Sequence, residues 1–480
     1  MTANFSTEFS LSMGESEAFA RLCGDFNPLH VDAVTARRTQ FGGTVIHGIH
    51  LLLRSLDELA ARQALEYQEP AALSATFHNP VLTGTVVKLM VTAVGATRIR
   101  VSAQSAGRPA FTSTVELKPA YADAMIEDLE FAPTRPAEMD YPPTVSTGAV
   151  PLQLGRELLN RLFPSLAALV SRSWIADLLA TTQVVGMRCP GMDSIYSGLK
   201  LRRLAQNDGS ASELRYQIAG SEGRLRLVRM QVNGSYFAGT IEAFFRPRPV
   251  MQRTMREVAA LVPSPICSGH RVLIVGGSRG LGEVAAKIAA AGGADVTITY
   301  ARGQQDAERV CAEIKESGRH CETRRLDAMD LESERTWLRS CNFSHVYFFA
   351  SPPIAANTDR WNEDLFQQFR SVYVTAFATL VELTTARRRH DAPVHYLYPS
   401  SIFVEQPENG FAEYIAAKTE GEALCDRLAR QANARFTKPR LPRLRTDQTS
   451  ALVDAGAGDP LPPLLAIVRQ FHQSATPVGV

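Results

Sequence analysis

The segment LCGDFNPLH, residues 22–30, brings together side chains that can move protons. Asp25 and His30 supply a carboxyl and an imidazole, which enzymes commonly use as general acids and bases. Asn27 and a proline stand between them, and an apolar run with helical spacing follows from residue 44. Asp and Asn-Pro are also common turn residues. The segment can therefore equally be interpreted as a polar loop before a helix, or His30 as a structural histidine.

A second set of reactive side chains lies nearer the C-terminus. Tyr414 and Lys418 are four residues apart in YIAAK and would share one face of a helix. A neighbouring ammonium favours the tyrosinate and lowers the tyrosine pKa, which makes the phenol a usable proton donor near neutral pH. Ser400 and Ser401 end the strand candidate VHYLYPSS, at the edge where parallel sheets bind ligands. Alone, the tyrosine–lysine spacing is also typical of an exposed helix face.

A glycine-rich turn precedes this set in the chain. In RVLIVGGSRGLGE, Gly276, Gly280 and Gly282 stand between a buried-strand pattern and a helical pattern. Glycine lets the backbone turn tightly, and it lets a pyrophosphate approach the helix N-terminus, whose free N–H groups and dipole favour anions. The same turn occurs where a strand simply packs on a helix, so the pattern by itself leaves both interpretations open.

These side chains must be positioned by several domains, since 480 residues indicate about three. Proline-rich stretches at 119–150 and 246–268 predict linkers. Residues 1–120 show one long helical run followed by strand-like segments, an α+β pattern, and residues 150–247 repeat the plan. Strands and helices alternate over residues 269–448, which predicts a doubly wound parallel sheet.

The composition argues against several classes of protein. A net charge of +2 is too small to indicate nucleic acid or an anionic membrane as a partner. The seven cysteines are scattered without a CxxC pair, which favours reduced thiols over disulfides or a zinc site, so we expect no metal. No signal peptide or membrane-spanning stretch is evident, and we expect a cytoplasmic protein.

Together, CGDFNPLHVD and FGGTVIHGIHLL resemble the MaoC-like family of hot-dog dehydratases and (R)-specific enoyl hydratases. The resemblance covers residues 1–118 and, more loosely, 150–247 as a degenerate second hot dog. It implies that Asp25 and His30 move the protons and that the backbone N–H of Gly48 stabilises the thioester oxyanion. Which of the two side chains carries which proton stays open.

The glycine turn, the serine and YIAAK occur in the order typical of the short-chain dehydrogenase/reductase family, which residues 270–448 resemble. The resemblance implies that Tyr414 protonates the substrate oxygen, and that Lys418 lowers the tyrosine pKa and holds the ribose. Ser401, thirteen residues before Tyr414, would bind the substrate carbonyl. The implied cofactor contacts are Gly276, Ser278, Arg279, Gly280, Leu281, Gly282, Arg302, Asp327, Tyr414 and Lys418.

The expected cofactor is NADPH rather than NADH. The second strand ends DVTITYARG without an acid that would bind a ribose diol, whereas Arg279 and Arg302 suit a 2′-phosphate. Several departures from the family pattern bear on the proton relay. Val275 replaces the usual threonine, FFASPPI replaces Asn-Ala-Gly, PRLPRLRTDQT stands where Pro-Gly is usual, and Tyr373 or a neighbour stands where the catalytic asparagine is expected.

The two implied reactions are consecutive. Reduction of a 3-oxoacyl thioester gives a 3-hydroxyacyl thioester, and dehydration then gives the enoyl thioester. We therefore predict a bifunctional enzyme, dimeric, that acts on acyl-CoA or acyl carrier protein thioesters. An alternative keeps only the dehydratase, with the reductase-like domain as a non-catalytic NADPH-binding or assembly module. In a third, purely structural interpretation both sites are silent.

Overall fold

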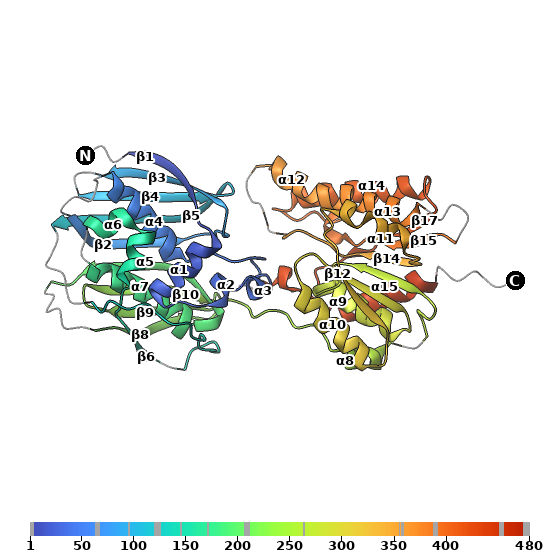
Figure 1. Ribbon diagram of the computed structural model, residues 1–480, viewed down its shortest axis with the longest axis horizontal. Helices are drawn as coiled ribbons and strands as arrows, with labels where there is room; N and C mark the ends of the chain where they lie inside the picture. Colours follow the sequence, from blue (N-terminus) through green and yellow to red (C-terminus); the bar gives the residue numbers. More distant parts are fainter. Residues whose placement is uncertain are drawn as a thin grey trace. The chain divides into compact units, whose positions relative to one another are not determined.

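The structure is a computed structural model, and it describes residues 4–62, 68–94, 97–119, 126–144, 146–169, 172–205, 212–262, 265–354, 356, 360–386, 392–450 and 456–473. The chain forms two compact units, one ending at Pro249 and the other beginning at Val250 (Figure 1). None of the helices in the described ranges has the length and apolar character needed to cross a membrane.

A single antiparallel sheet of ten strands organises the first unit, and its two halves have the same topology. The strand order is β1-β3-β4-β5-β2-β7-β10-β9-β8-β6. Counted outward from the central β2–β7 pair, the second half therefore repeats the order of the first. The strands are β1 (Phe5–Ser10), β2 (Gln68–Phe77), β3 (Val86–Val94), β4 (Arg98–Ser105), β5 (Arg108–Pro119), β6 (Thr147–Pro151), β7 (Ser194–Arg203), β8 (Glu213–Glu222), β9 (Leu227–Asn233) and β10 (Phe237–Phe245).

Each half carries helices between its first and second strands. In the first half these are α1 (Met13–Cys23), α2 (Pro28–Val31), α3 (Ala33–Ala36) and the long α4 (Gly48–Ala61). Strands such as β3 alternate exposed and buried residues, as expected when only one face of a sheet is covered. Fully buried leucines of α4, including Leu52, Leu53 and Leu56, belong to the same core as the inward residues of the sheet.

The corresponding helical segment of the second half is divided into several helices. The apolar run at 157–187 forms α5 (Arg156–Leu162), α6 (Pro164–Leu169), α7 (Arg172–Gln183) and a π-helical turn at Val184–Arg188. Pro164 lacks an N–H and fits the first position of a new helix. The connection between the halves is also more than a spacer, because within it the Phe131 N–H donates to the carbonyl of Arg21 and the Ala137 N–H to that of Met187.

Six parallel strands form the main sheet of the second unit. Their order is β13-β12-β11-β14-β15-β17, which is the 3-2-1-4-5-6 order of doubly wound nucleotide-binding sheets. The strands are β11 (Arg271–Val275), β12 (Asp295–Tyr300), β13 (Cys321–Arg325), β14 (His345–Phe348), β15 (Val394–Leu397) and β17 (Ala434–Thr437). A short side pair, β16 (Ser400–Ser401) and β18 (Arg440–Leu441), follows the main sheet.

Helices cover both faces of this sheet and enclose two cores. One core includes residues of α8 (Met255–Leu261), α9 (Gly280–Ala291), α10 (Gln304–Glu316) and α15 (Leu461–Gln473). The other includes residues of α11 (Arg335–Ser340), α12 (Glu363–Arg370), α13 (Phe377–Thr385) and α14 (Ala412–Ala429), with a π-helical turn at Ser371–Ala376 between α12 and α13. The predicted fold class, a double α+β hot dog followed by a doubly wound sheet, is confirmed. Two helices were not predicted from the sequence. Helix α8 lies in the stretch 246–268 that was predicted to be a linker, and α15 lies beyond residue 448, the predicted end of the last domain.

Candidate active sites

The first candidate site is the loop that follows α1. Helix α1 ends at Gly24, whose φ of +74° is the left-handed conformation that a glycine adopts without strain. The chain then turns so that Asn27 becomes the cap of α2, and its side-chain oxygen accepts a hydrogen bond from the Leu29 N–H at 3.0 Å. Asp25 and His30 therefore lie on either side of the Asn27 cap, and this cap fixes the backbone conformation around both residues.

The carboxyl group of Asp25 is buried and held by two donors. Asp25 is only 1% exposed. Its Oδ1 atom accepts a hydrogen bond from the Asn27 N–H at 3.1 Å, and its Oδ2 atom accepts one from the Thr182 hydroxyl at 2.9 Å. Burial raises the pKa of Asp25 above its ordinary value, while the nearby His30 and these two donors act in the opposite direction. Burial therefore works against the charged form of this carboxyl, and its hydrogen-bond donors support that form.

Two imidazoles lie against this carboxyl. His30 Nδ1 is 2.6 Å from the carbonyl oxygen of Val45, which requires the proton on Nδ1 and leaves Nε2 as the basic nitrogen of the neutral ring. His47 stacks on His30 with ring centroids 3.7 Å apart, and its Nε2 lies 3.1 Å from the backbone oxygen of Asp25 and 3.7 Å from Oδ2. Burial lowers the pKa of both histidines, so both favour the neutral ring.

Gly48 begins α4 directly after His47. The first N–H groups of a helix have no partner within the helix, and the helix dipole makes this end attractive to negative charge. A Cβ at position 48 would come within 2.8 Å of the Phe77 ring, so the aromatic ring packs on the helix end only because residue 48 is glycine. The structure therefore brings the predicted oxyanion donor, the carboxyl and the imidazole to one place.

The second half of the first unit supplies contacts to Asp25 and Asn27 that were not predicted from the sequence. Besides Thr182, the π-helical turn after α7 places Gly186 so close to Asp25 that any Cβ there would overlap the carboxylate. The Asn27 amide nitrogen donates to the carbonyls of Gly186 and Gly191, at 3.2 and 2.9 Å. The sequence of the second half has no acid–histidine cluster of its own. Its residues instead contact and hold the loop that carries Asp25 and Asn27 in the first half.

The second candidate site lies after β15, at the carboxyl edge of the parallel sheet. The Ser401 hydroxyl accepts from the Phe403 N–H at 3.2 Å, and Tyr414 stands in the first turn of α14. A hydrogen bond donated by the Ser401 hydroxyl to the tyrosine oxygen lowers the pKa of Tyr414, but burial outweighs it and raises that pKa to about 12. Ser400, the neighbour, instead donates to Glu422 at 2.5 Å, which leaves Ser401 as the serine that faces the tyrosine.

Lys418 lies one helical turn further along α14, fully buried. Its ammonium donates to the carbonyl of Pro399 at 2.8 Å and lies 5.9 Å from the centre of the Tyr414 ring. Burial lowers the pKa of Lys418 to about 7. The expected lowering of the tyrosine pKa by lysine is therefore not what dominates in this structure, because desolvation of both groups is the larger effect.

Tyr373 is one of the residues at or beside the position where the family pattern predicts an asparagine. It belongs to the π-helical turn between α12 and α13, and such turns are frequent at functional sites. The Lys418 ammonium lies 3.6 Å from the centre of its ring, a cation–π contact. Its hydroxyl is 2.6 Å from the hydroxyl of Ser351, which belongs to the FFASPPI segment. The two departures from the family pattern thus contact each other.

The glycine turn forms a cradle at the start of α9. Gly276 has a φ of +82°, and a Cβ there would come within 2.9 Å of the Ala350 backbone nitrogen. A Cβ at Gly282 would overlap the carbonyl oxygen of Gly276. Ser278, Gly280 and Leu281 lie between them, partly exposed at the helix N-terminus. This arrangement fits a dinucleotide pyrophosphate, which needs close backbone approach to free N–H groups.

The other predicted cofactor contacts differ in their availability. Arg279 forms an ion pair with Asp447 at 3.1 Å, so part of its charge is already compensated. Arg302 is exposed two residues after β12. Asp327 lies after β13, and its carboxylate accepts the Met329 N–H at 2.9 Å.

Comparison with known families identifies both parts of the chain. Residues 1–113 match the model of the family described as MaoC like domain, and residues 270–435 match the one described as short chain dehydrogenase. Both predicted resemblances are therefore confirmed over these residues. No curated protein matches the sequence.

Solved structures of short-chain dehydrogenases resemble the second part. One from Burkholderia cenocepacia, in complex with NADP, is 25% identical with a TM-score of 0.38, covering 42% of this chain and 89% of its own. A dehydrogenase/reductase from Sinorhizobium meliloti is 21% identical with a TM-score of 0.40, covering 46% and 93%. A short-chain dehydrogenase/reductase from Serratia marcescens is 21% identical with a TM-score of 0.39, covering 44% and 92%.

Proposed function

Because this chain joins a MaoC-like dehydratase domain to a short-chain dehydrogenase domain, we propose that it catalyses two consecutive reactions on acyl thioesters. The first is NADPH-dependent reduction of a 3-oxoacyl thioester, and the second is dehydration of the resulting 3-hydroxyacyl thioester, or hydration of the enoyl thioester in reverse. The substrate is carried by coenzyme A or acyl carrier protein. The observation that supports the second step best is the convergence of Asp25, His30 and Gly48 on one loop and helix end.

Dehydration needs one proton removed from the α carbon and one given to the leaving hydroxyl. Burial raises the pKa of Asp25 and lowers that of His30, so each shift is directed toward the neutral form, and the proposed starting state is a neutral carboxyl with a neutral imidazole. In that state His30 Nε2 accepts the α proton, and the Asp25 carboxyl donates its proton to the β oxygen, which leaves as water. Proton transfer from the imidazolium back to the carboxylate restores the starting pair.

Negative charge develops on the thioester oxygen as the α proton leaves. The N–H of Gly48 and the dipole of α4 offer stabilisation at that point. His47 stays neutral and orients the loop through the Asp25 carbonyl.

Reduction is proposed at Ser401, Tyr414 and Lys418. When bound, NADPH supplies a hydride to the substrate carbonyl carbon. The Ser401 hydroxyl orients the carbonyl oxygen, and Tyr414 gives its proton to that oxygen. Lys418 lies within reach of the tyrosine helix face and, when charged, favours loss of that proton. The glycine cradle binds the pyrophosphate, and the exposed Arg302 favours NADPH over NADH.

A second candidate function retains only the dehydratase. The Tyr373–Ser351 hydroxyl pair favours it, because a tyrosine at or beside the position expected for the family's asparagine would alter the relay that returns a proton to Tyr414. In this case the second unit binds NADPH without turnover.

The deciding experiment is a panel of 3-oxoacyl and 3-hydroxyacyl thioesters, on both carriers, with NADPH absorbance and enoyl formation followed separately. The bifunctional proposal expects Asp25→Asn to lose enoyl formation while NADPH oxidation continues, and Tyr414→Phe to give the opposite result. Unaltered protein that binds NADPH but oxidises none with any 3-oxoacyl thioester would support the second candidate. Full hydratase activity in Asp25→Asn would contradict both.

A further inference from the structure

Four of the chain's ten histidines gather in the second unit, away from its proposed reductase site. His270 directly precedes β11, His345 begins β14, His395 lies in β15, and His472 lies in the last turn of α15. These positions are at the amino edge of the parallel strands, whereas the glycine turn and Ser401 follow the carboxyl ends. His345 is at the centre, with ring centroids 4.3 Å from His270, 4.2 Å from His472 and 5.1 Å from His395.

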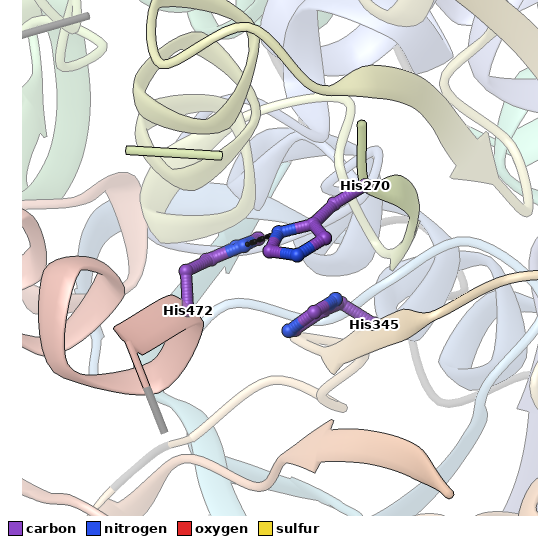
Figure 2. A group of neighbouring side chains, drawn as sticks. All are labelled: His270, His345 and His472. Atoms are coloured by element: carbon purple, nitrogen blue, oxygen red, sulfur yellow. Dashed lines mark hydrogen bonds between the residues drawn. The ribbon is translucent and has the colours of Figure 1, made fainter. Parts of the chain in front are cut away.

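Three of these rings bring nitrogen atoms together. The Nδ1 atoms of His270 and His472 are 2.6 Å apart, and Figure 2 shows this contact with His345 beside it. One nitrogen from each of the three residues lies within 4.8 Å of the others. Among the residues that the structure describes, no carboxylate or thiol joins this group.

His345 has a nitrogen that nothing satisfies. The residue is 1% exposed, and its Nε2 has no hydrogen-bond partner among the described residues. Its other nitrogen, Nδ1, lies 3.0 Å from the hydroxyl of Ser344. A proton on Nδ1 donated to that hydroxyl leaves Nε2 as a buried lone pair, which is costly in an apolar core unless something binds it.

His472 is oriented in the same manner. Its Nε2 is 2.7 Å from the hydroxyl of the fully buried Tyr347, and a proton there leaves Nδ1 as the lone-pair nitrogen. A partner on the far nitrogen that fixes tautomer and ring orientation is typical of histidines that bind metals. Ser344 and Tyr347 therefore prepare two lone pairs, and His270 contributes a third nitrogen from a partly exposed ring.

We propose that His270, His345 and His472 form a binding site for one divalent transition-metal ion of the zinc class. Three imidazoles without carboxylates suit Zn²⁺, Ni²⁺ or Cu²⁺ rather than Mg²⁺ or Ca²⁺, and a water completes the coordination. At metal–nitrogen distances of about 2.0–2.1 Å, tetrahedral ligands are about 3.3 Å apart, so the two Nδ1 atoms must separate slightly. The His345 ring must also tilt, because it now lies within 13° of parallel to His472. The proton between the Nδ1 atoms moves to Nε2 of His270, and all three rings stay neutral.

The ion would fasten the C-terminal helix to the sheet. His472 belongs to α15, while His270 and His345 mark the starts of two neighbouring strands, β11 and β14. A ligand that binds only the folded state stabilises it by mass action. Since the site is at the opposite strand ends from Ser401, the ion would stabilise the unit without entering the chemistry.

The test uses the full-length protein, treated with a chelator and titrated with Co²⁺ and with Zn²⁺. We expect one Co²⁺ per chain with a visible absorption band, its displacement by Zn²⁺, and a higher melting temperature with Zn²⁺. His270→Asn, at the partly exposed position, should lose the band. Tyr347→Phe keeps the ligands but removes the partner of His472, and should weaken binding about 10–100-fold. His320→Asn, an exposed histidine of the same unit, is the matched control and should bind as the unaltered protein does.

Two results would overturn the proposal. One is the absence of a Co²⁺ band and of a Zn²⁺-dependent melting shift in the folded, unaltered protein. The other is unchanged binding in both His270→Asn and Tyr347→Phe, which would place the ion elsewhere. The group Asp25, His30 and His47 is the other candidate in the described part of the chain, so loss of binding in His30→Asn would assign the ion there. Both informative variants avoid replacing the central His345, whose removal threatens folding.

Discussion

Thr182→Val tests whether the second half of the first unit sets the pKa of the Asp25 carboxyl, the proposed acid. Thr182 is 3% exposed, and its hydroxyl donates to Asp25 Oδ2 at 2.9 Å. Valine keeps the shape and removes only this donor. The hydroxyl lowers the pKa of Asp25, so its loss raises that pKa further. A hydrogen bond to a charged group contributes about 1.5–3 kcal/mol, which corresponds to a rise of about 1–2 pKa units.

The same free energy sets the expected loss of rate. The carboxylate charge develops as Asp25 gives its proton to the leaving hydroxyl, and Thr182 stabilises that charge. Without it, kcat/KM for dehydration should fall about 10–100-fold. If Asp25 acts as the acid, activity falls as pH rises through its pKa, so the falling limb of the pH profile should move to higher pH in Thr182→Val.

The assay is kcat/KM for enoyl thioester formation across pH, with Thr181→Val as the control. Thr181 neighbours Thr182 on α7, but its hydroxyl donates to the Leu178 carbonyl of its own helix at 2.6 Å. An unchanged plateau and unchanged limbs in Thr182→Val would refute the reasoning, as would an equal loss in Thr181→Val. Movement of the rising limb instead would show that Asp25 is the base, and the roles of Asp25 and His30 would be exchanged.

Three further predictions concern the second unit. Tyr414→Phe should lower the rate of NADPH-dependent 3-oxoacyl reduction about 10²–10⁴-fold, which is the usual contribution of a general acid, and should leave dehydration kinetics unchanged. A reduction rate equal to that of the unaltered protein would show that the tyrosine is not the acid. Gly282→Ala should weaken NADPH binding measured by fluorescence, because its Cβ overlaps the Gly276 carbonyl and distorts the cradle; unaltered affinity would contradict the assigned phosphate site. The pKa of Lys418 is about 7 in the folded state against 10.5 for the free side chain, so the unfolded state binds more protons between these values and stability rises with pH there. The free energy of unfolding, measured with denaturant across pH, should rise by about 5 kcal/mol in the unaltered protein relative to Lys418→Met. The same pH dependence of this free energy in both proteins would refute the prediction.

Much of the fold follows from local sequence. The strand–glycine–helix pattern at residues 271–291 and the alternation after it predict a doubly wound sheet because parallel strands need crossover helices. The apolar period that begins at residue 44 predicts a helix buried along one side, although α4 starts only at Gly48. Tyr414 and Lys418 could be proposed as site residues for the same reason, because their four-residue spacing is local.

Contacts between distant segments could not be predicted in this way. No local signal marks Thr182 or Gly186 as partners of Asp25, because their proximity depends on β2 pairing with β7 and on a π-helical turn. The same holds for Tyr373 and Ser351, which meet only when α12, α13 and the segment after β14 are packed.

The sequence by itself determined which chemical groups this protein carries and their order along the chain, because it specifies side-chain identity and short-range spacing. Only the tertiary structure decided what surrounds them. Burial sets the pKa directions of Asp25, His30 and Lys418, and burial depends on every element packed around a group. The histidines at 270, 345 and 472 illustrate the difference most clearly: they are unremarkable in sequence, and the sheet order and the C-terminal helix bring their nitrogens together.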